Sequence, residues 1–572
     1  MAKALLSGNE AVARGAYEAG CQVACAYPGT PSTEILEEIS KYKEIYCEWS
    51  VNEKVALEVA LGASLTGARS LCAMKHVGLN VASDPLFSSA YIGVNGGFII
   101  VTCDDPGMHS SQNEQDNRFY GLFAKIPVLC PSDSQEAKDL VIKAFEISEE
   151  FDIPVILRMT TRVSHCKSVV SLGERKEKGI KGYKKDVSKT NLLPQFAKRR
   201  HVLLEEKIER LKEYSNNFVY NRFEKRSDDL LVIADGVAYQ YAKEVFKDAS
   251  FLKLTMVYPF PDKLVTNICQ NYKEIIVVEE VDPFIELMVK SLGFKVKGKD
   301  YLPKFDELNP DKLKVFIKRD TKEEAKTDNL PRRPPALCPG CPHIGTFYLL
   351  QKKDYIITGD IGCYTLGALA PHYAMDTCVC MGASITLACG IEKVNKRIND
   401  GRPIIAIIGD STFFHMGLPG LLNMVYNKCD IILFILDNET TGMTGHQDHP
   451  GTGKTLTGEE TKRILPEDIA RACGVEQVYV LNPYKIKENK KIIDKLLKEK
   501  KQAVVVMREP CIFLKKREKP KEVDIELCTG CKLCIRLGCP AISYEDSKAK
   551  INKIFCVGCG MCIEVCPKGA IK

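Results

Sequence analysis

The sequence predicts an α/β protein with three parallel-sheet domains, followed by a small cysteine-rich domain. Two observations predict the sheets: short buried apolar runs alternate with helical patterns, and polar turns follow the runs where parallel strands would end. A third observation predicts the small domain, since eight of the 25 cysteines fall between residues 528 and 566. The length of 572 residues is enough for three or four domains.

The expected domain boundaries follow changes in composition. Residues 1–165 alternate strands, as at 97–102 and 127–130, with helices such as 55–65, and residues 166–228 read as a charged connection with one or two solvated helices. Strands at 230–234 and 274–278 place a smaller α/β unit at 229–320. A proline-rich linker at 321–335 leads to a third α/β unit at 336–515, and the cysteine-rich tail occupies 520–572.

Composition excludes several functional classes. The net charge of +6 is small for this length, so a nucleic-acid-binding protein is not expected. No apolar run approaches the ~18 residues of a membrane helix, and no signal peptide is recognisable, so we expect a cytoplasmic protein without a membrane anchor. In a reducing compartment, 25 cysteines indicate metal or redox chemistry rather than disulfides.

The tail contains two cysteine triplets, each followed by a Cys-Pro pair. The first run is Cys528, Cys531, Cys534 and Cys539, and the second is Cys556, Cys559, Cys562 and Cys566. Thiolates at these spacings favour two [4Fe-4S] clusters, whereas zinc ribbons use two CxxC pairs. The first run has one residue more before its last cysteine than the second.

Over its whole length the tail resembles a bacterial-type two-cluster ferredoxin domain. In such domains the fourth cysteine of each run binds the other cluster. The resemblance therefore implies two ligand sets, one of Cys528, Cys531, Cys534 and Cys566, the other of Cys556, Cys559, Cys562 and Cys539. The extra residue before Cys539 departs from the pattern of the family.

Two strand ends in the third unit carry polar residues. A buried strand at 403–408 ends in Gly409-Asp410-Ser411, a helical stretch follows at about 416–427, and a strand at 431–436 ends in Asp437-Asn438-Glu439-Thr440. A right-handed βαβ unit brings both turns to one sheet edge. Asp410, Asn438 and a backbone carbonyl near Thr440 can then share a Mg²⁺ ion with a diphosphate. Either turn alone is ordinary after a strand.

The two turns resemble the thiamine diphosphate signature, in which GDG is followed some 25 residues later by NN. Ser411 and Asp437 depart from that pattern, but Asp410 and Asn438 keep its metal ligands. The resemblance implies thiamine diphosphate with Mg²⁺, bound by Gly409, Asp410, Ser411, Asn438 and Thr440. Upstream, Gly382 begins a small-residue helix that would let the backbone approach the cofactor closely; close helix packing is the alternative.

The N-terminal domain contains a candidate for the carboxylate that thiamine needs beside its pyrimidine ring. That candidate is Glu53, although Ser50 and Glu53 also fit a capping box before an apolar helix. Residues 27–32 resemble the YPxTPS motif of ferredoxin-dependent 2-oxoacid oxidoreductases. The resemblance assigns the pyrimidine carboxylate to Glu53 and a substrate-carboxylate contact to Thr30, for which a turn or helix cap is the alternative. His109 and Arg118 are candidates for polar contacts to the substrate.

The segments 409–415, 441–447 and 338–343, together with the order of the domains, resemble the large (alpha) subunits of indolepyruvate ferredoxin oxidoreductases over nearly the whole chain. The resemblance implies thiamine-enzyme domains for pyrimidine (1–165) and diphosphate (336–515), around a transketolase-like middle domain. It implies oxidative decarboxylation of aryl pyruvates to aryl-acetyl-CoA through a thiamine diphosphate carbanion, with ferredoxin as acceptor, in anaerobic aromatic amino acid degradation. A smaller beta subunit in an α2β2 assembly is also implied, as are cofactor contacts by Cys341 and His343.

Cys338, Cys341 and Cys363 raise the question of a third cluster. In relatives such as pyruvate ferredoxin oxidoreductase, a CxxC pair and a Gly-Cys turn hold a cluster near thiamine, and Cys511 is the candidate fourth ligand here. Alternatively, Cys338 and Cys341 shape a loop over the diphosphate. Two rival functions also stay open: the same chemistry on another 2-oxoacid, and an electron-transfer subunit without its own thiamine site.

Overall fold

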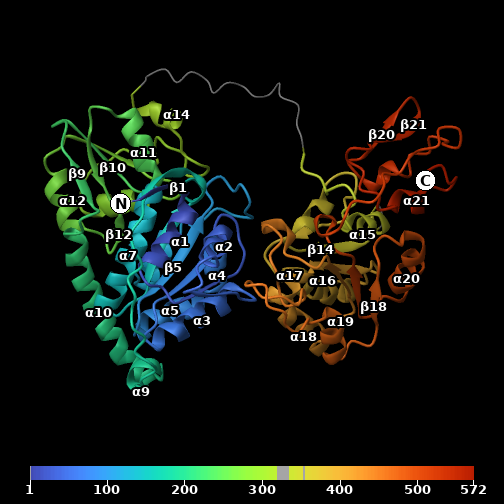
Figure 1. Cartoon of the computed structure of the whole chain (residues 1–572), viewed down its shortest axis with the longest axis horizontal. Helices are drawn as coiled ribbons and strands as arrows, with labels where there is room; N and C mark the ends of the chain where they lie inside the picture. The colour runs from blue at the N-terminus through green and yellow to red at the C-terminus, as the bar shows by residue number, and fades with distance from the viewer. Residues whose placement is uncertain (1, 318–333, 352–353) are drawn as a thin grey trace. The chain divides into compact units, whose positions relative to one another are not determined.

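The computed structural model describes residues 2–317, 334–351 and 354–572. The chain folds as two compact units, Met1–Lys326 and Thr327–Lys572, drawn from blue to green and from yellow to red in Figure 1. In the described ranges, no helix has the length and apolar content needed to cross a bilayer. The predicted linker at 321–335 lies outside the described residues, apart from its last two.

The first unit is built on a seven-stranded sheet of order β12-β6-β7-β5-β4-β2-β3. All neighbours pair in parallel except the edge strand β12. The strands are β2 (Val23–Ala26), β3 (Tyr46–Trp49), β4 (Ser70–Lys75), β5 (Phe98–Asp104), β6 (Val128–Leu129), β7 (Val155–Thr160) and β12 (Met256–Tyr258). Every residue of β4, β5 and β7 is buried, as expected for central strands covered on both faces. The strands expected at 97–102 and 127–130 are therefore confirmed.

Helices cover this sheet, and their first turns show why they begin where they do. Asn52 caps α3 by accepting a hydrogen bond from the Val55 backbone N–H (2.9 Å), and Asp133 caps α7 in the same way. The helices are α1 (Gly8–Glu18), α2 (Thr33–Ile39), α3 (Glu53–Leu65), α4 (His76–Val81), α5 (Ser83–Ile92), α6 (Arg118–Ala124), α7 (Ser134–Phe151) and α8 (Thr161–His165). The strands β1 (Lys3–Ser7) and β8 (Lys167–Ser171) form a separate antiparallel pair.

The charged connection contains the expected solvated helices, α9 (Val187–Thr190) and α10 (Pro194–Asn216). Asp152, which follows α7 with a left-handed φ of 52°, ties this connection to the first sheet. Its side-chain oxygens accept hydrogen bonds from Lys189, Arg200 and Lys207. Three cations on one half-buried carboxylate hold its pKa below the ordinary value, although burial alone would raise it.

A smaller, mostly parallel sheet of order β13-β10-β11-β9 completes the first unit. It consists of β9 (Arg222–Glu224), β10 (Leu230–Ala234), β11 (Ser250–Lys253) and β13 (Glu274–Val278), with helices α11 (Gly236–Val245), α12 (Asp262–Cys269), α13 (Phe284–Ser291) and α14 (Pro310–Leu313). The strands at 230–234 and 274–278 are confirmed. Two strands lie elsewhere than the expected boundaries suggest: β9 falls within the charged connection, and β12 of the middle segment joins the first sheet.

Arg118 joins the two sheets of the first unit through a buried ionic network. Its guanidinium is fully buried, and it donates to Asp116 (2.9 Å), Glu279 (2.7 Å) and Asp235 (3.2 Å). Two further donations go to the backbone oxygens of Glu280 and Asp282. The expectation that Arg118 contacts substrate is wrong for this structure, because its donors are committed to protein acceptors far from solvent.

The second unit holds a six-stranded parallel sheet of order β15-β14-β16-β17-β19-β18. Its strands are β14 (Ile356–Gly359), β15 (Thr377–Cys378), β16 (Ile404–Gly409), β17 (Ile432–Asp437), β18 (Val478–Leu481) and β19 (Ala503–Arg508). The helices are α15 (His343–Leu350), α16 (Ala383–Ile398), α17 (Asp410–Thr412), α18 (Leu418–Tyr426), α19 (Pro466–Ala472) and α20 (Ile486–Glu499). A π-helical turn at Phe413–Gly417 links α17 to α18, and α18 lies within the helical stretch expected at about 416–427.

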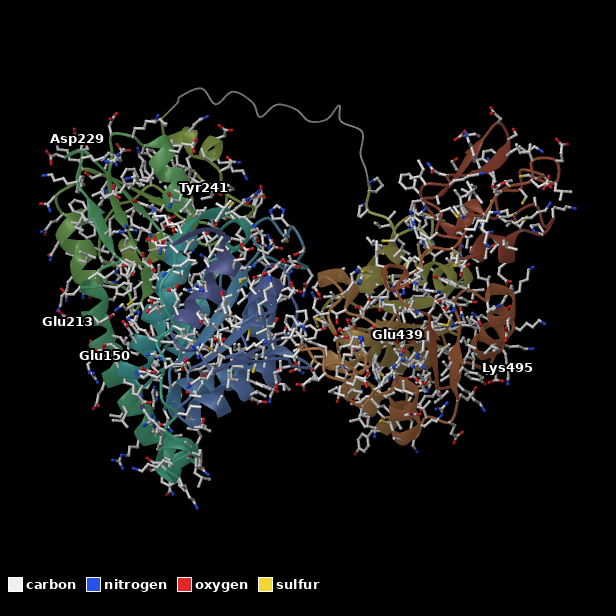
Figure 2. All side chains as sticks on the ribbon, in the orientation of Figure 1. Glu150, Glu213, Asp229, Tyr241, Glu439 and Lys495 are labelled. Carbon is white, nitrogen blue, oxygen red and sulfur yellow. The ribbon has the colours of Figure 1, made fainter. Side chains whose placement is uncertain are left out.

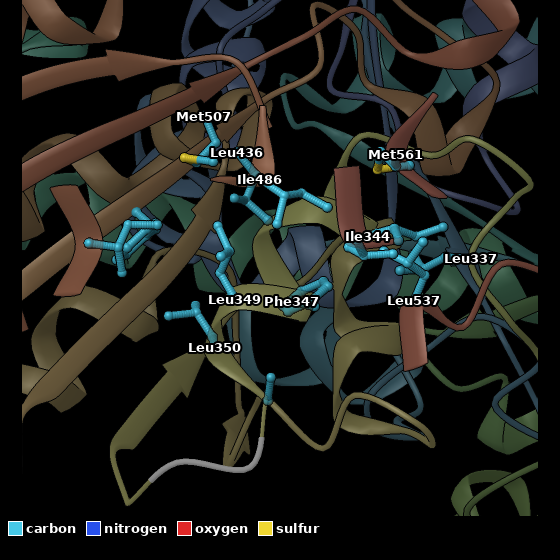
Figure 3. Close-up of a cluster of buried hydrophobic side chains, with 14 of the residues drawn as sticks. Leu337, Ile344, Phe347, Leu349, Leu350, Leu436, Ile486, Met507, Leu537 and Met561 are labelled. Atoms are coloured by element: carbon cyan, nitrogen blue, oxygen red, sulfur yellow. The ribbon is translucent and has the colours of Figure 1, made fainter. Parts of the chain in front are cut away.

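The cysteine-rich tail packs against the helices α15 and α20 of the second unit. It forms a hairpin of β20 (Ile542–Glu545) and β21 (Lys548–Ile551), followed by α21 (Met561–Val565). Leu537 and Met561 of the tail belong to the same buried cluster as Leu337, Ile344 and Phe347 (Figure 3). The tail and the diphosphate-binding part therefore share one hydrophobic core.

We predict that Arg118→Met destabilises the first unit by about 3–5 kcal/mol, because three buried carboxylates lose their common cation. The single tryptophan, Trp49, lies on β3 of this unit, so its fluorescence during urea titration reports the unfolding. Arg199→Met, at an exposed position of α10, is the control and should change stability little. Equal midpoints for the two variants would contradict the role given to Arg118.

Candidate functional site

The predicted metal ligands meet at the carboxyl edge of the second sheet. β16 and β17 pair in parallel up to Gly409 and Leu436, so both strands end together. Asp410 follows β16, and one terminal atom of the Asn438 side-chain amide lies 3.1 Å from Asp410 Oδ1 and 2.9 Å from the Thr440 backbone oxygen. The structure thus brings Asp410, Asn438 and Thr440 together.

The geometry of these three groups fits a magnesium ion. When the nitrogen of the Asn438 amide faces Asp410 and Thr440, it donates to both oxygens. When the amide is rotated so that its oxygen occupies this position, that oxygen lies at the same distances from Asp410 Oδ1 and the Thr440 carbonyl oxygen. Adjacent ligands of an octahedral Mg²⁺ with bonds of about 2.0–2.1 Å lie about 3 Å apart. The three groups can therefore bind Mg²⁺ when the oxygen of the Asn438 amide, and not its nitrogen, faces Asp410 and Thr440.

His449 orients the Asp410 carboxylate, and no pattern along the chain predicted this contact. The Gly451 N–H donates to His449 Nδ1 (3.1 Å), so the ring proton is on Nε2, which lies 3.2 Å from Asp410 Oδ2. The Ser411 N–H donates to the other oxygen, Oδ1 (2.9 Å). Burial would raise the pKa of Asp410, but His449 and this N–H hold it below the ordinary value. Oδ1 therefore remains directed at Asn438.

The two departures from the thiamine signature are built into neighbouring contacts. Asp437 accepts a hydrogen bond from Arg508 Nε (2.6 Å), and Arg508 also binds Glu467 through two bonds. Burial and the nearby Asp410 charge raise the pKa of Asp437 to about 6, against the effect of Arg508. Ser411 Oγ accepts a hydrogen bond from Thr441 (2.9 Å). Asp437 and Ser411, which depart from the signature, are thus each held by a hydrogen bond, from Arg508 and Thr441 respectively.

The turn after β17 is held in place by its own side chains. Glu439, labelled in Figure 2, has a left-handed φ of 58° and accepts a hydrogen bond from Arg463 (2.7 Å). The left-handed residue turns the chain back, so that Thr440 presents its carbonyl oxygen toward Asn438. This local geometry places the third predicted ligand.

Gly382 and Gly409 lie at the carboxyl edge of the second sheet, where neighbouring atoms leave no space for a side chain. Gly382 has a φ of 88°, and a Cβ there would lie 2.6 Å from the Met416 backbone oxygen. Its N–H and that of Ser384 donate to the buried Asp360 (both 3.0 Å), which fixes the start of α16. A Cβ on Gly409 would lie 2.6 Å from the Tyr364 ring. Both predicted glycines therefore permit close backbone approach at this edge.

Four cysteines lie beside Asp410 and Asn438. The Cys341 N–H donates to the Cys338 carbonyl (3.0 Å), and the Cys511 N–H donates to the Asn438 carbonyl (2.9 Å). Burial raises the pKa of Cys341, and the neighbouring sulfurs of Cys338, Cys363 and Cys511 add to the rise. A Cβ on Gly442 would contact both Asn438 Nδ2 (3.4 Å) and Cys363 Sγ (3.7 Å). Cys511 thus joins the three cysteines that the sequence singled out.

His343, at the start of α15, is buried in the same region. Burial lowers its pKa to about 4, while the Asp410 charge acts in the opposite direction. Its ring packs edge-on against Tyr364, with the ring centres 5.9 Å apart. His343 is therefore a neutral imidazole near the metal ligands rather than a cation.

The tail has two cavities, each lined by four of its eight cysteines. One cavity is lined by Cys528, Cys531, Cys534 and Cys566 together with Lys532, Pro567 and Lys568. The other is lined by Cys539, Cys556, Cys559 and Cys562 together with Pro339 and Gly340. In the described ranges no three His, Cys, Asp or Glu side chains are placed to share one metal ion. In a [4Fe-4S] cluster each thiolate binds its own iron.

In the first unit, Glu53 begins α3 at the edge of the large sheet. Its side chain is 5% exposed, and a Cβ on Gly78 would lie 2.7 Å from its Oε1. The alternative capping box with Ser50 is not formed, because Asn52 is the cap and Ser50 Oγ donates to Glu48 (2.8 Å). Asn52, and not Ser50, therefore caps α3.

Thr30 lies in the loop after β2, against the loop that follows β5. Ser110 Oγ donates to the Thr30 carbonyl (3.3 Å), and Lys75 Nζ donates to the Ser110 carbonyl (2.6 Å) and hydroxyl (3.1 Å). His109 is not brought into this contact: its side chain is 48% exposed, and its Nε2 lies 3.4 Å from Glu307. Lys75 was not recognised in the sequence, since nothing along the chain links it to Ser110.

Family models match three stretches of the chain. Residues 14–221 match the thiamine diphosphate-binding domain of pyruvate flavodoxin/ferredoxin oxidoreductases, and residues 360–507 match the C-terminal TPP-binding domain of thiamine pyrophosphate enzymes. Residues 521–567 match the 4Fe-4S dicluster domain. With the sheet edges and the cysteine-lined cavities, these matches define a thiamine diphosphate-dependent 2-oxoacid oxidoreductase that transfers electrons through iron–sulfur clusters to ferredoxin.

Whole-chain relatives identify the family. The chain is 44% identical to the indolepyruvate oxidoreductase subunit IorA of Archaeoglobus fulgidus, over 100% of this chain and 97% of that protein. It is 43% identical to the subunit of the same name from Methanothermobacter marburgensis, over 99% and 97%. The chain belongs to this family of indolepyruvate oxidoreductase IorA subunits.

Among solved structures, the chain is similar to the 2-oxoglutarate:ferredoxin oxidoreductase of Magnetococcus marinus. The TM-score is 0.45 at 16% identity, over 55% of this chain and 64% of that chain. This neighbour is too distant to add to the assignment.

We predict that His449→Leu weakens divalent-metal binding about 10–100-fold, because the oriented Asp410 carboxylate loses its hydrogen-bonded partner. Mn²⁺, titrated into the purified protein and followed by electron paramagnetic resonance, measures the affinity directly. The control is His201→Leu on the exposed face of α10. An unchanged Mn²⁺ affinity in His449→Leu would show that Asp410 needs no such partner.

Proposed function

We propose that this chain catalyses the ferredoxin-dependent oxidative decarboxylation of aryl pyruvates of the indolepyruvate type to aryl-acetyl-CoA and CO₂. The names of the whole-chain relatives support the choice of substrate. The runner-up is the same chemistry on another 2-oxoacid.

The observation that carries the proposal is the position of the loop 338–341. On one side its cysteines adjoin Cys363 and Cys511, beside Asp410 and Asn438. On the other side Gly340 lines the cavity of Cys539, Cys556, Cys559 and Cys562, and a Cβ on it would lie 3.6 Å from Cys559 Cβ. The loop 338–341 thus adjoins both the sheet edge that carries Asp410 and Asn438 and the cavity lined by Cys539, Cys556, Cys559 and Cys562.

Thiamine diphosphate, when bound, supplies the electron sink that lets a 2-oxoacid lose CO₂. In our proposal Asp410, Asn438 and the Thr440 carbonyl hold Mg²⁺, and the backbone at Gly409, Ser411 and Gly382 faces the diphosphate. Cys341 and His343 close this edge. Glu53 bonds the pyrimidine ring, and Thr30 contacts the substrate. The dense set of oriented donors at Asp410 argues against the rival function of a purely electron-transferring subunit.

We assign two [4Fe-4S] clusters to the tail and a third to the second sheet. The tail sets are those proposed from the cysteine runs, and each of them lines a single cavity. The third set is Cys338, Cys341, Cys363 and Cys511, which adjoin one another. Oxidation of one 2-oxoacid releases two electrons, and such clusters accept electrons one at a time.

The proposal includes partners. A smaller second subunit completes an α2β2 assembly, coenzyme A accepts the acyl group, and ferredoxin takes the electrons in an anaerobic cytoplasm. The test is an anaerobic panel of 2-oxoacids with coenzyme A, followed by reduction of a dye or ferredoxin. Indolepyruvate and phenylpyruvate should be turned over fastest. Preference for a non-aromatic 2-oxoacid would refute the substrate assignment, and failure with every 2-oxoacid would refute the activity.

We predict that Glu53→Gln keeps thiamine and iron contents but lowers turnover by at least about a hundredfold, because an amide cannot exchange a proton with the pyrimidine ring. Glu58→Gln, one turn further along α3 and exposed, is the matched control. Thiamine is measured after acid extraction, and turnover by dye reduction. Near-normal turnover of the folded Glu53→Gln protein would remove Glu53 from the site.

We predict that Cys511→Ser lowers the iron content from about twelve to about eight per chain, since one of three four-iron clusters loses a ligand. Substitution is a sharper test than removal of the tail, because the tail shares its core with the second sheet. Cys166→Ser, at an exposed site of the first unit, is the control. About eight irons in both the wild type and Cys511→Ser would show that no third cluster forms.

A further inference from the structure

Lys75 is a buried cation at the carboxyl end of β4. The residue is 8% exposed, and its side chain passes alongside Gly29, where an added Cβ would lie 3.0 Å from Lys75 Cβ. Its ammonium donates to the Ser110 carbonyl (2.6 Å) and to the Ser110 hydroxyl (3.1 Å). These acceptors are neutral, and an ammonium has three N–H donors.

None of the described residues forms an ion pair with Lys75, which is unusual for a buried lysine. Asp105 is the carboxylate whose charge reaches it, but the Asp105 oxygens accept bonds from the Ser110 N–H (2.9 Å), Ser111 (2.5 Å) and Thr161 (2.9 Å). Burial lowers the pKa of Lys75 to about 8 in spite of Asp105. The Ser110 hydroxyl also lies 3.4 Å from Asp105 Oδ2, so Asp105 acts on Lys75 through Ser110 and not by direct contact. With two acceptors at Ser110, the ammonium retains one N–H that can donate to an anion.

The position of Lys75 relates it to both residues that the family motif assigns. Ser110 connects it to Thr30, because the Ser110 hydroxyl that accepts from Lys75 lies 3.3 Å from the Thr30 carbonyl. Lys75 also directly precedes α4, whose Gly78 packs against the Glu53 carboxylate. Thr30, Glu53 and Lys75 therefore occupy one edge of the same sheet.

The two residues expected to make polar contacts to the substrate have protein partners instead. Arg118 is fully buried among Asp116, Asp235 and Glu279, and His109 faces Glu307. Unlike Arg118 and His109, Lys75 has no carboxylate within ion-pair distance among the described residues.

We propose that Lys75 binds the carboxylate of the 2-oxoacid. The inference rests on the proposed function and adds the group that recognises the acid. An ammonium that donates to a carboxylate forms a charge-assisted bond, which is stronger than its bonds to Ser110. The reaction removes this carboxylate as CO₂, so the contact stabilises bound substrate and is lost as the reaction proceeds. Its removal should therefore raise KM more than it lowers kcat.

The test compares Lys75→Gln, Lys75→Met and Lys75→Arg in the full chain with its second subunit. Both neutral variants should raise the KM for the 2-oxoacid about ten- to a hundredfold, with an unchanged KM for coenzyme A and unchanged thiamine content. Lys75→Arg, which keeps the charge, should restore most of the affinity. Lys143→Met, at a surface ion pair of α7, should behave as wild type.

Calorimetry on the thiamine-free protein gives a second readout that does not depend on turnover. Indole-3-propionate and 3-phenylpropionate carry the carboxylate without the ketone, and their amides lack the charge. Wild type should bind each acid more tightly than its amide, and the neutral variants should lose that difference. Either a KM for Lys75→Gln within about twofold of wild type, or equal binding of acid and amide by wild type, would overturn the inference.

The same measurements separate this inference from the proposed function. A wild-type protein that turns over no 2-oxoacid refutes the function, and calorimetry then decides alone whether Lys75 binds a carboxylate. If Lys75→Met does not fold, Lys75→Gln retains polar contacts to Ser110 and carries the test.

Discussion

The structure depends on one constraint: its two large sheets are built mainly from parallel strands, whose carboxyl ends lie along one edge. Because the strands are buried on both faces, polar side chains are confined to that edge and to the turns beyond it. In the second unit the edge gathers Asp410, Asn438 and four cysteines; in the first it gathers Thr30, Lys75 and the start of α3. The chemistry of both units follows from where their strands stop.

Buried charge is handled in two opposite ways within the first unit. Arg118 has more carboxylates than it can neutralise, and burial raises the pKa of Glu279 to about 7 even though Arg118 opposes the rise. Lys75 has none within ion-pair distance among the described residues. The Arg118 network is complete without a ligand and stabilises the fold. Lys75 donates only to neutral acceptors and can therefore still bind an anionic ligand. By this criterion Arg118 is a structural residue and Lys75 is a candidate ligand-binding residue.

The same contrast explains what the sequence could predict. Apolar runs identified the strands at 230–234, 274–278 and 404–409, and turns directly after strands identified Asp410 and Asn438, because both signals are local. Arg118 was misjudged because partners such as Glu279 lie more than a hundred residues away. His449 and Cys511 were missed or left open for the same reason, since only folding brings them to Asp410 and Asn438.

The core that the tail shares with the second sheet has a consequence for damage by oxygen. Cys562 and Cys534 are themselves buried members of the cluster that contains Phe347 and Leu436. A cluster destroyed by air would leave sulfur atoms and a void inside the packing that supports the diphosphate edge, rather than in a detachable appendage. Aerobic inactivation of this chain would then be followed by unfolding and aggregation of the whole second unit, and reconstitution with iron and sulfide would have to refold it.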